Sequence, residues 1–430
     1  MRVLMFGWEF PPHISGGLGT ASYGLTKGMT TLDDLEVIFV VPKSWGDEDQ
    51  GVVRLIGANK VPVAYKHIYY KGTRMPIEKI EVSSKIIPYT DPEDFWKVTR
   101  SEVTGHKLYI QTNRKGMVDF SGRYDSNLQD EIYKYSIVAS VIAEENEFDV
   151  IHAHDWLAYP AGIAAMEVSG KPLVIHVHAT DFDRSGGNVN PDVYWIEKRG
   201  MDAASKIITV SNLTRDIVIN KYGIHPDKVE TVYNAVEPVN FTEDIVVNKG
   251  FDEKVVTFLG RITLQKGPEY FIEAAYKVLK VMKNVRFVMA GSGDMMERMM
   301  RRAASLRITD RFHFTGFLKG KDVFTMLTMS DVYIMPSVSE PFGISPLEAM
   351  QSNVPVIISK QSGVAEILTH AVKTDFWDID AMADAIYGIL NYPALSNMFI
   401  KNGKEEVIRL KWDNSARHVK DIYERVIWHK

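Results

Sequence analysis

The 430-residue sequence contains no cysteine, and this absence excludes several kinds of site. Disulfide bonds, thiolate zinc sites, iron–sulfur clusters and a cysteine nucleophile all need that side chain. No apolar run approaches the ~18 residues of a membrane span. An excess of positive charge is also lacking, because 50 lysine and arginine residues stand against 55 aspartate and glutamate residues. We therefore expect neither a nucleic-acid partner nor a membrane partner.

The N-terminal segment Met1–Phe6 lacks the features of a targeting sequence. It leads directly into a predicted strand, without the apolar region and small-residue cleavage site of a signal peptide. This predicts a cytoplasmic protein. Hydrophobic residues make up 45% of the chain, and its length predicts two to four domains at ~100–200 residues each. No pattern in the sequence indicates an oligomeric state.

Short β-branched apolar runs alternate with longer stretches of helical periodicity, and they form two series. Repeated strands and helices require crossover connections, so we expect two mainly parallel sheets covered by helices on both faces. The first series comprises Val3–Phe6, Val37–Val41, Val150–His154, Leu173–His178, Ile207–Val210 and Val229–Tyr233. The second series comprises Val255–Leu259, Val285–Ala290, Phe312–Thr315, Val332–Met335 and Val356–Ile358.

The segment Glu237–Lys254 separates the two series and has no clear period, which is typical of a linker between domains. We predict a first domain over residues 1–237 and a second over 238–411. The weakly patterned stretch from about Ser44 to Gly122 is interpreted as loops, hairpins and an insertion. A final predicted helix covers residues 412–430. One of its faces carries the apolar residues Ala416, Val419, Ile422, Tyr423, Val426 and Ile427.

Ligands of open α/β sheets bind beyond the carboxyl ends of the strands, so the loops after the strands are the expected place for chemistry. After the first strand, Gly16 and Gly17 precede a predicted helix. Two interpretations remain open. Either the backbone N–H groups of this loop approach an anion, or the glycines serve a turn that needs a positive φ.

Two His-x-His pairs lie at the ends of predicted strands, and side chains two residues apart share one face of a strand. They are His152 with His154 and His176 with His178. Such pairs are also zinc-ligand patterns, but a structural imidazole or a substrate contact is the commoner fate, and we predict no bound metal. His178 is the strongest candidate for a substrate contact, because it closes its strand and precedes a polar loop.

The first strand of the second series leads into a loop with two cations, Arg261 and Lys266, before a glycine and a helix. Arginine offers a planar fork and lysine a point charge, so together with a helix N-terminus they predict a diphosphate-binding clamp. The alternative is a pair of solvated surface charges.

The segment Ser339–Met350 carries two carboxylates, Glu340 in a loop and Glu348 in the first turn of a predicted helix. Ser345 and Glu348 fit the spacing of a capping box, so Glu348 serves either the helix or a ligand. Glu340 has no such structural role. The backbone N–H groups of residues 343–345 offer a second place for an anion.

Four segments together resemble the retaining glycosyltransferases of the GT-B fold, and most of all the glycogen (starch) synthases of bacteria and archaea. They are Gly-Gly-Leu, His-Ala-His-Asp-Trp, Gly-Arg-Ile-Thr-Leu-Gln-Lys-Gly and Glu-Pro-Phe-Gly-Ile-Ser-Pro-Leu-Glu-Ala-Met. The resemblance spans nearly the whole chain. It implies two Rossmann-like domains with parallel sheets facing across a cleft, a nucleotide-sugar donor held mainly by the second, and a final helix that crosses back to the first.

The resemblance also implies roles for single residues. Arg261 and Lys266 would bind the donor diphosphate and stabilise the leaving nucleoside diphosphate. Glu340 would hydrogen-bond the hydroxyls of the donor sugar, and His178 would contact the same sugar. Further residues would bind the donor, among them Glu348 at the ribose. They are Gly16, Gly17, Asn234, Gly343, Ile344, Ser345 and Glu348.

The implied reaction is the transfer of glucose from ADP- or UDP-glucose to the non-reducing end of an α-1,4-glucan, with anomeric retention and no further cofactor. Such an enzyme would serve glycogen biosynthesis. The chain departs from the family at Ile14, where these synthases typically carry lysine, and in the loop Ala179–Asp183. A hexosyltransferase with a small or lipid-linked acceptor, which would form sucrose, trehalose or a glycolipid, therefore stays open. So does a nucleotide-sugar-binding scaffold without turnover.

Overall fold

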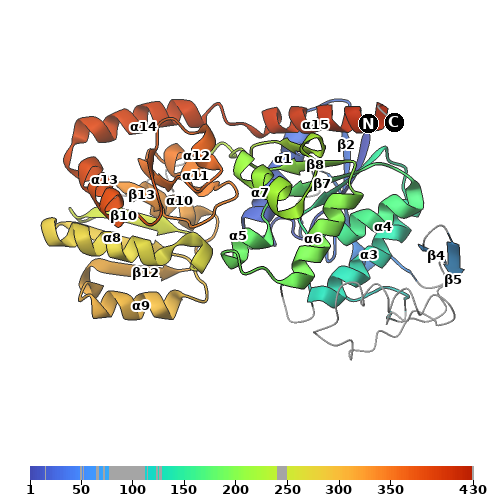
Figure 1. Ribbon diagram of the computed structural model, residues 1–430, viewed down its shortest axis with the longest axis horizontal. Helices are drawn as coiled ribbons and strands as arrows, with labels where there is room; N and C mark the ends of the chain where they lie inside the picture. The colour runs from blue at the N-terminus through green and yellow to red at the C-terminus, as the bar shows by residue number, and fades with distance from the viewer. Residues whose placement is uncertain are drawn as a thin grey trace.

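The computed structural model consists of two α/β domains, each built on a parallel sheet with helices on both faces (Figure 1). It describes residues 1–14, 16–48, 51, 53–63, 67–70, 73–76, 112–113, 115–122, 124, 128–239 and 249–428. Most of the stretch interpreted as loops, hairpins and an insertion, and much of the predicted linker, lie outside the described residues. None of the helices in the described part of the chain combines the length and the apolar character that a membrane crossing needs.

The first domain contains a seven-stranded sheet with the order β3-β2-β1-β6-β7-β8-β9, and all neighbouring strands are parallel. The strands are β1 (Arg2–Phe6), β2 (Glu36–Val41), β3 (Arg54–Gly57), β6 (Val150–His154), β7 (Leu173–Val177), β8 (Lys206–Thr209) and β9 (Val229–Thr231). The helices are α1 (Gly17–Met29), α3 (Leu128–Glu145), α4 (Tyr159–Ser169), α5 (Asp181–Ser185), α6 (Pro191–Ala203) and α7 (Asn212–Tyr222). A separate antiparallel hairpin joins β4 (His67–Tyr70) to β5 (Thr73–Pro76).

The second domain contains a six-stranded parallel sheet with the order β12-β11-β10-β13-β14-β15. The strands are β10 (Lys254–Leu259), β11 (Val285–Ala290), β12 (Phe312–Gly316), β13 (Val332–Met335), β14 (Val356–Ser359) and β15 (Val372–Thr374). The helices are α8 (Pro268–Val281), α9 (Met296–Ser305), α10 (Lys321–Thr328), α11 (Ser345–Gln351), α12 (Val364–Ile367), α13 (Ile379–Asn391) and α14 (Pro393–Val407). A 3-10 turn, η4 (Leu264–Lys266), precedes α8.

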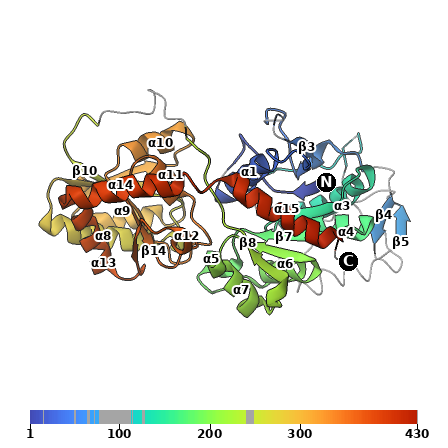
Figure 2. The same ribbon diagram turned by 90° about the horizontal axis from the view of Figure 1, so that it is seen from above.

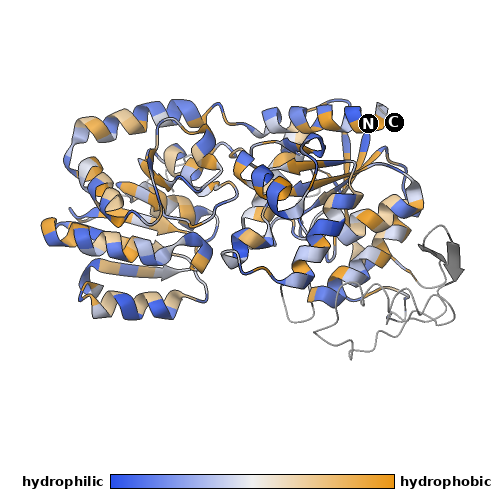
Figure 3. Cartoon of the chain, viewed as in Figure 1, coloured by the Kyte–Doolittle hydropathy of each residue, from blue (hydrophilic) through white to orange (hydrophobic). Residues whose placement is uncertain are grey.

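The predicted α/β architecture with two parallel sheets is confirmed, and each predicted strand is present close to its expected bounds. Strands β1, β6 and β7 are buried almost along their whole length, which is why they read as continuous apolar runs. The outer helices carry hydrophilic residues beside hydrophobic ones (Figure 3). Two strands of the domain sheets were not predicted. Both β3 and β15 lie at a sheet edge and are only partly buried, so neither carries a strong apolar run.

The last helix, α15 (Trp412–Trp428), leaves the second domain and packs against α1 of the first (Figures 1 and 2). The crossing that the resemblance implied is therefore confirmed. The predicted apolar face is the packed face, and it joins the core formed by β1, β2 and α1. Trp412, Ala416, Val419, Ile422 and Tyr423 are buried there.

A second junction between the domains lies at the N-terminus of α7. The Glu366 carboxylate of α12 accepts the backbone N–H groups of Asn212 (2.9 Å) and Leu213 (2.8 Å). It also accepts the Tyr233 hydroxyl at 2.9 Å. A carboxylate stabilises a helix N-terminus because the first N–H groups have no partner in the helix. One side chain of the second domain thus holds a helix of the first.

Two glycines of α1 allow α15 to approach closely. A Cβ atom at Gly24 would lie 2.3–2.8 Å from the Trp412 indole, and one at Gly28 would lie 2.7 Å from the Trp412 backbone. We expect Gly24→Ala to destabilise the protein by about 1–3 kcal/mol, because the extra methyl overpacks this contact. Urea unfolding followed by tryptophan fluorescence measures the change.

Gly388→Ala in α13 is the matched control, since a Cβ there meets only a Leu395 methyl at 3.8 Å. It should stabilise its helix by about 0.5–1 kcal/mol through the lower backbone entropy of alanine. Equal stabilisation by both substitutions would contradict the close packing of α1 against α15.

Candidate active site

The candidate site residues lie in loops that follow the carboxyl ends of strands in both sheets. His178 follows β7, Arg261 and Lys266 follow β10, and Glu340 follows β13. These loops meet across the domain boundary, because α5 contacts η4 and Ser339 hydrogen-bonds Asp183. The structure therefore brings the loops that carry His178, Lys266 and Glu340 into contact.

Lys266 and Glu340 form an ion pair between the loops after β10 and β13. Glu340 is buried, and the same carboxylate oxygen accepts the Ser337 hydroxyl at 3.2 Å. Arg261 is exposed, and within the described residues its guanidinium has no ion pair. One cation is thus held beside a carboxylate and the other points to solvent, an arrangement that suits a ligand with negative charge next to hydroxyl groups.

Glycines lock the loops of the second domain together. Gly267 has a φ of 64°, and a Cβ there would lie 2.1 Å from the Pro336 carbonyl oxygen. Gly291 has a φ of 143°, and a Cβ there would lie 1.8 Å from the Gly260 carbonyl oxygen. Only glycine fits such contacts, so the small residues after β11 have a structural reason, namely support of the loop that carries Arg261.

The helix after Glu340 begins differently from the prediction. Ile344 is the N-cap of α11 and Ser345 is its first helical residue, without a side-chain cap. The capping-box interpretation of Ser345 and Glu348 is therefore wrong, because the helix starts one residue too early for it. Gly343 has a φ of 98°, and the N–H groups of residues 343–345 donate to no backbone carbonyl of the described chain. These groups are free to bind an anion.

Glu348 is left without a capping role. It lies in the first helical turn and is partly buried, and burial raises the pKa of its carboxyl from 4.5 to about 7. A carboxyl with that pKa binds or releases a proton when a ligand reaches it at neutral pH.

The two His-x-His pairs form one cluster, in which His152, His154 and His176 are buried and His178 is partly buried. His154 Nδ1 lies 2.9 Å from His178 Nε2, and His152 Nδ1 lies 2.5 Å from the Tyr423 hydroxyl of α15. Burial, with a smaller contribution from the Arg184 guanidinium, lowers the pKa of His178 to about 3. His178 is therefore a neutral imidazole at physiological pH, suited to hydrogen bonding and not to carrying charge.

A metal ion fits this cluster poorly as it stands. Ligand atoms of His152, His154 and His176 lie within 4.8 Å of one another. The three rings stack, however, with interplanar angles of 6–23°. Stacked imidazoles direct their lone pairs along parallel planes and not toward one point, as a metal ion needs. The prediction of a metal-free site remains a prediction.

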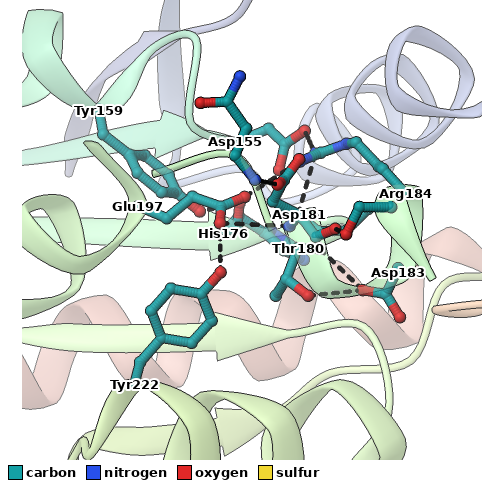
Figure 4. A network of polar contacts seen from close by, with 12 residues as sticks. Asp155, Tyr159, His176, Thr180, Asp181, Asp183, Arg184, Glu197 and Tyr222 are labelled. Atoms are coloured by element: carbon teal, nitrogen blue, oxygen red, sulfur yellow. Dashed lines mark hydrogen bonds and ion pairs between the residues drawn. The ribbon is translucent and has the colours of Figure 1, made fainter. Parts of the chain in front are cut away.

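The polar loop after His178 forms α5 and a buried ionic network that the sequence did not reveal (Figure 4). Arg184 donates to Asp155 at 2.7 Å and to Glu197 at 3.0 Å, and Tyr222 also donates to Glu197. Burial disfavours the Arg184 charge, but the two carboxylates outweigh it and raise its pKa above the usual value. Asp155 adopts a φ of 62°, which is uncommon for this residue type and fits its role as a buried partner.

The donor contacts of Gly16, Gly17 and Asn234 remain predictions. Gly16 is extended, with a φ of −172°, and Gly17 is not among the positive-φ glycines. The interpretation as a positive-φ turn is therefore wrong. A Cβ at either glycine meets no atom within 4 Å, so the two positions face open space. Asn234 is buried, close to the junction with α15, where Ser415 donates to the Tyr233 carbonyl.

Comparison with known proteins gives two family matches. Residues 241–406 match the family described as glycosyl transferases group 1. Residues 118–239 match the family described as glycosyltransferase family 4. The two matches divide close to the predicted linker, so each falls largely within one of the two sheets.

Some curated relatives match over nearly the full length of the chain. An uncharacterized glycosyltransferase of Methanocaldococcus jannaschii is 27% identical, and the match covers 98% of each chain. The glycogen synthase of Mycobacterium tuberculosis is 22% identical, over 98% of this chain and 94% of the synthase. Among solved structures, sucrose-phosphate synthase from Thermosynechococcus elongatus superposes with a TM-score of 0.71 at 15% identity, over the whole of both chains. The predicted GT-B fold is therefore confirmed.

The raised pKa of Glu348 leads to a testable pH dependence. Between its usual value of 4.5 and about 7, the folded protein keeps a proton that the unfolded chain loses, so this group's contribution to stability falls as pH rises through 7. Ribose hydroxyls would donate to the ionised carboxylate and lower its pKa. We expect the affinity for ADP or UDP to rise between pH 6 and pH 8, with proton release, as measured by titration calorimetry.

Glu348→Gln is the control, because its amide does not titrate. The affinity of this variant should rise less over the same pH range, because only the terminal phosphate of the nucleotide still titrates. An equal pH dependence in wild type and variant would contradict the predicted contact between Glu348 and the ribose.

Proposed function

We propose that this chain, a glycosyltransferase of the GT-B type, transfers glucose from ADP- or UDP-glucose to the non-reducing end of an α-1,4-glucan. The observation that carries the proposal is the ion pair between the partly exposed Lys266 and the buried Glu340, with Arg261 exposed on the same loop as the lysine. A sugar diphosphate has negative charge and hydroxyl groups side by side. The pair offers a cation for the first and a carboxylate for the second.

The leaving group of this reaction is a nucleoside diphosphate, so charge develops on phosphate oxygens as the glycosidic bond breaks. Arg261 and Lys266 would neutralise that charge, and the N–H groups of residues 343–345 would add fixed dipoles. Because these donors are held in place before the reaction, they would need little reorganisation in the transition state. No metal ion is required for this step in the proposal.

His178 would contribute as a neutral group. Its low pKa excludes a charged imidazolium near pH 7, and its Nε2 atom shares a hydrogen bond with His154. We assign it a hydrogen bond to the donor sugar. Glu340 would orient the sugar hydroxyls, since its carboxylate is already held by Lys266 and Ser337. A path on one face of the sugar would give anomeric retention without an enzyme nucleophile, whereas a covalent path would need Glu340 or His178 as the nucleophile.

The glucan acceptor rests on the resemblance to glycogen synthases and on the similarity to the Mycobacterium tuberculosis enzyme. The likeness to sucrose-phosphate synthase keeps a small acceptor as the second candidate. Incubation with labelled ADP-, UDP- and GDP-glucose, each with glycogen, with a hexose phosphate or with buffer, separates the two. We expect label in glycogen with one or two of the donors. Label only in a low-molecular-weight product would favour the small acceptor, and no label in any arm would favour a scaffold without turnover.

Replacement of the two clamp cations tests the donor site. Arg261→Ala and Lys266→Ala should each lower kcat by about 10²–10³, the loss typical of one preorganised charge contact to the transition state. Steady-state release of nucleoside diphosphate measures the effect.

Lys277→Ala is the matched control, because Lys277 pairs with Asp380 on the surface of α8, away from this loop. Its turnover should equal that of the wild type. Full turnover in both clamp variants would rule out the proposed role of these cations.

A further inference from the structure

One direct side-chain hydrogen bond joins the loops that carry the candidate residues of the two domains. The Ser339 hydroxyl of the second domain donates to Asp183 Oδ1 of the first at 2.6 Å. Asp183 is 1% exposed, so the bond lies in a water-poor setting where an ionised acceptor gains most from a donor. The residue that follows Ser339 is Glu340, the proposed partner of the donor sugar.

Asp183 is held rigidly within its own domain. Its other carboxylate oxygen accepts the backbone N–H of Thr180 at 2.8 Å and the Thr180 hydroxyl at 2.9 Å. The Thr180 side chain in turn accepts the Asp183 backbone N–H, which completes a capping box for α5. The next residue, Arg184, is fixed by Asp155 and Glu197. The Asp183 oxygen that faces the second domain therefore has a set direction before the domains meet.

The contact extends to the proposed phosphate clamp. Helix α5 packs against η4, the turn that ends at Lys266, and a Cβ at Gly186 would meet a Leu264 methyl at 3.4 Å. Lys266 pairs with Glu340, and Glu340 follows Ser339. Asp183, Ser339, Glu340, Lys266 and α5 thus form a closed ring of contacts around the boundary between the domains.

We propose that Asp183 is a positioning residue, which aligns the Ser339–Glu340 segment with His178 when the two domains close on the donor. The inference rests on the donor site proposed above. Asp183 touches neither sugar nor phosphate in this proposal and acts through Ser339. Because His178 lies five residues before Asp183 in the same loop, one hydrogen bond sets the distance between the histidine of one domain and the glutamate of the other.

This role predicts a separation of kinetic effects. The side chains proposed to bind the diphosphate and the ribose, Arg261, Lys266 and Glu348, belong to the second domain. Loss of the Asp183–Ser339 bond should leave ADP or UDP affinity unchanged and lower kcat, which needs both domains in register. If the bond served only to stabilise the fold, its loss would lower thermal stability and the fraction of active enzyme. The apparent kcat and the amount of nucleotide bound would then fall together.

The test is a double-mutant cycle on the whole enzyme. Ser339→Ala and Asp183→Ala should each lower kcat about 10–100-fold, the size expected for a hydrogen bond to a charged group. The double variant should be no worse than the poorer single variant, because both remove the same contact. Ser339→Thr keeps the hydroxyl and should recover most of the turnover. Additive losses, or a fall in nucleotide affinity that matches the fall in kcat, would overturn the proposal.

Thr180→Val is the matched control for α5. It removes the hydroxyl that donates to the inner Asp183 oxygen and accepts the Asp183 backbone N–H, and it leaves the contact with Ser339, so it should lower the melting temperature and keep kcat. A kcat loss in Thr180→Val as large as that in Ser339→Ala would assign the effect to α5 stability and overturn the proposal.

Two further readouts separate this inference from the proposed acceptor. Release of nucleoside diphosphate without acceptor, and compaction on adding ADP or UDP measured by small-angle X-ray scattering, need no glucan. A wild type that hydrolyses or compacts but labels no glycogen refutes the glucan acceptor alone. Equal hydrolysis and equal compaction in wild type and Ser339→Ala refute the positioning role.

Discussion

The burial of the Arg184 charge is the constraint on which the first-domain side of the site depends. A guanidinium that is largely removed from water needs carboxylate partners. Asp155, directly after β6, and Glu197, in α6, supply these carboxylates. Asp155 adopts a left-handed backbone at the end of β6 to do so. The same charge contributes to the low pKa of His178. Helix α5, which contains Arg184, is therefore held by this ionic network as well as by the packing of Phe182 against the core.

The second domain reaches a similar rigidity by close backbone contact. Gly267 and Gly291 permit approaches to the Pro336 and Gly260 carbonyl groups that a Cβ atom would prevent, and they tie the loops after β10, β11 and β13 to one another. The cation loop and the carboxylate loop are held at a fixed separation before any ligand arrives. The first-domain side of the site is thus held by ion pairs, and the second-domain side is held by close backbone contacts at glycines. Both arrangements fix the positions of the candidate residues before a ligand binds.

Local sequence patterns predicted the parts of the fold whose cause is local. Buried strands such as Val150–His154 read as apolar runs because both of their faces are covered, and α15 read as amphipathic because one face is packed. The edge strands β3 and β15 were not predicted, because they are only partly buried and so lack a continuous apolar run. The prediction made Ser345 the N-cap of α11, but Ser345 is its first helical residue. A capping box depends on the backbone conformation at the N-cap, and residue spacing alone does not determine that conformation. The bonds of Arg184 and Ser339 join residues 13, 29 and 156 positions apart, and no local pattern encodes such pairs.

The path of the chain through α15 has a consequence for the order in which the molecule is made. A ribosome releases the strands of the first domain early, but the surface of α1 that receives Trp412 and Ile422 stays uncovered until the final helix emerges. The second domain, by contrast, is continuous in the chain and can close its core while translation is still under way. The domain that begins first is therefore completed last. Until α15 is made, the nascent first domain exposes the apolar surface of α1 that contains Gly24 and Gly28. Exposed apolar surface of this kind favours aggregation.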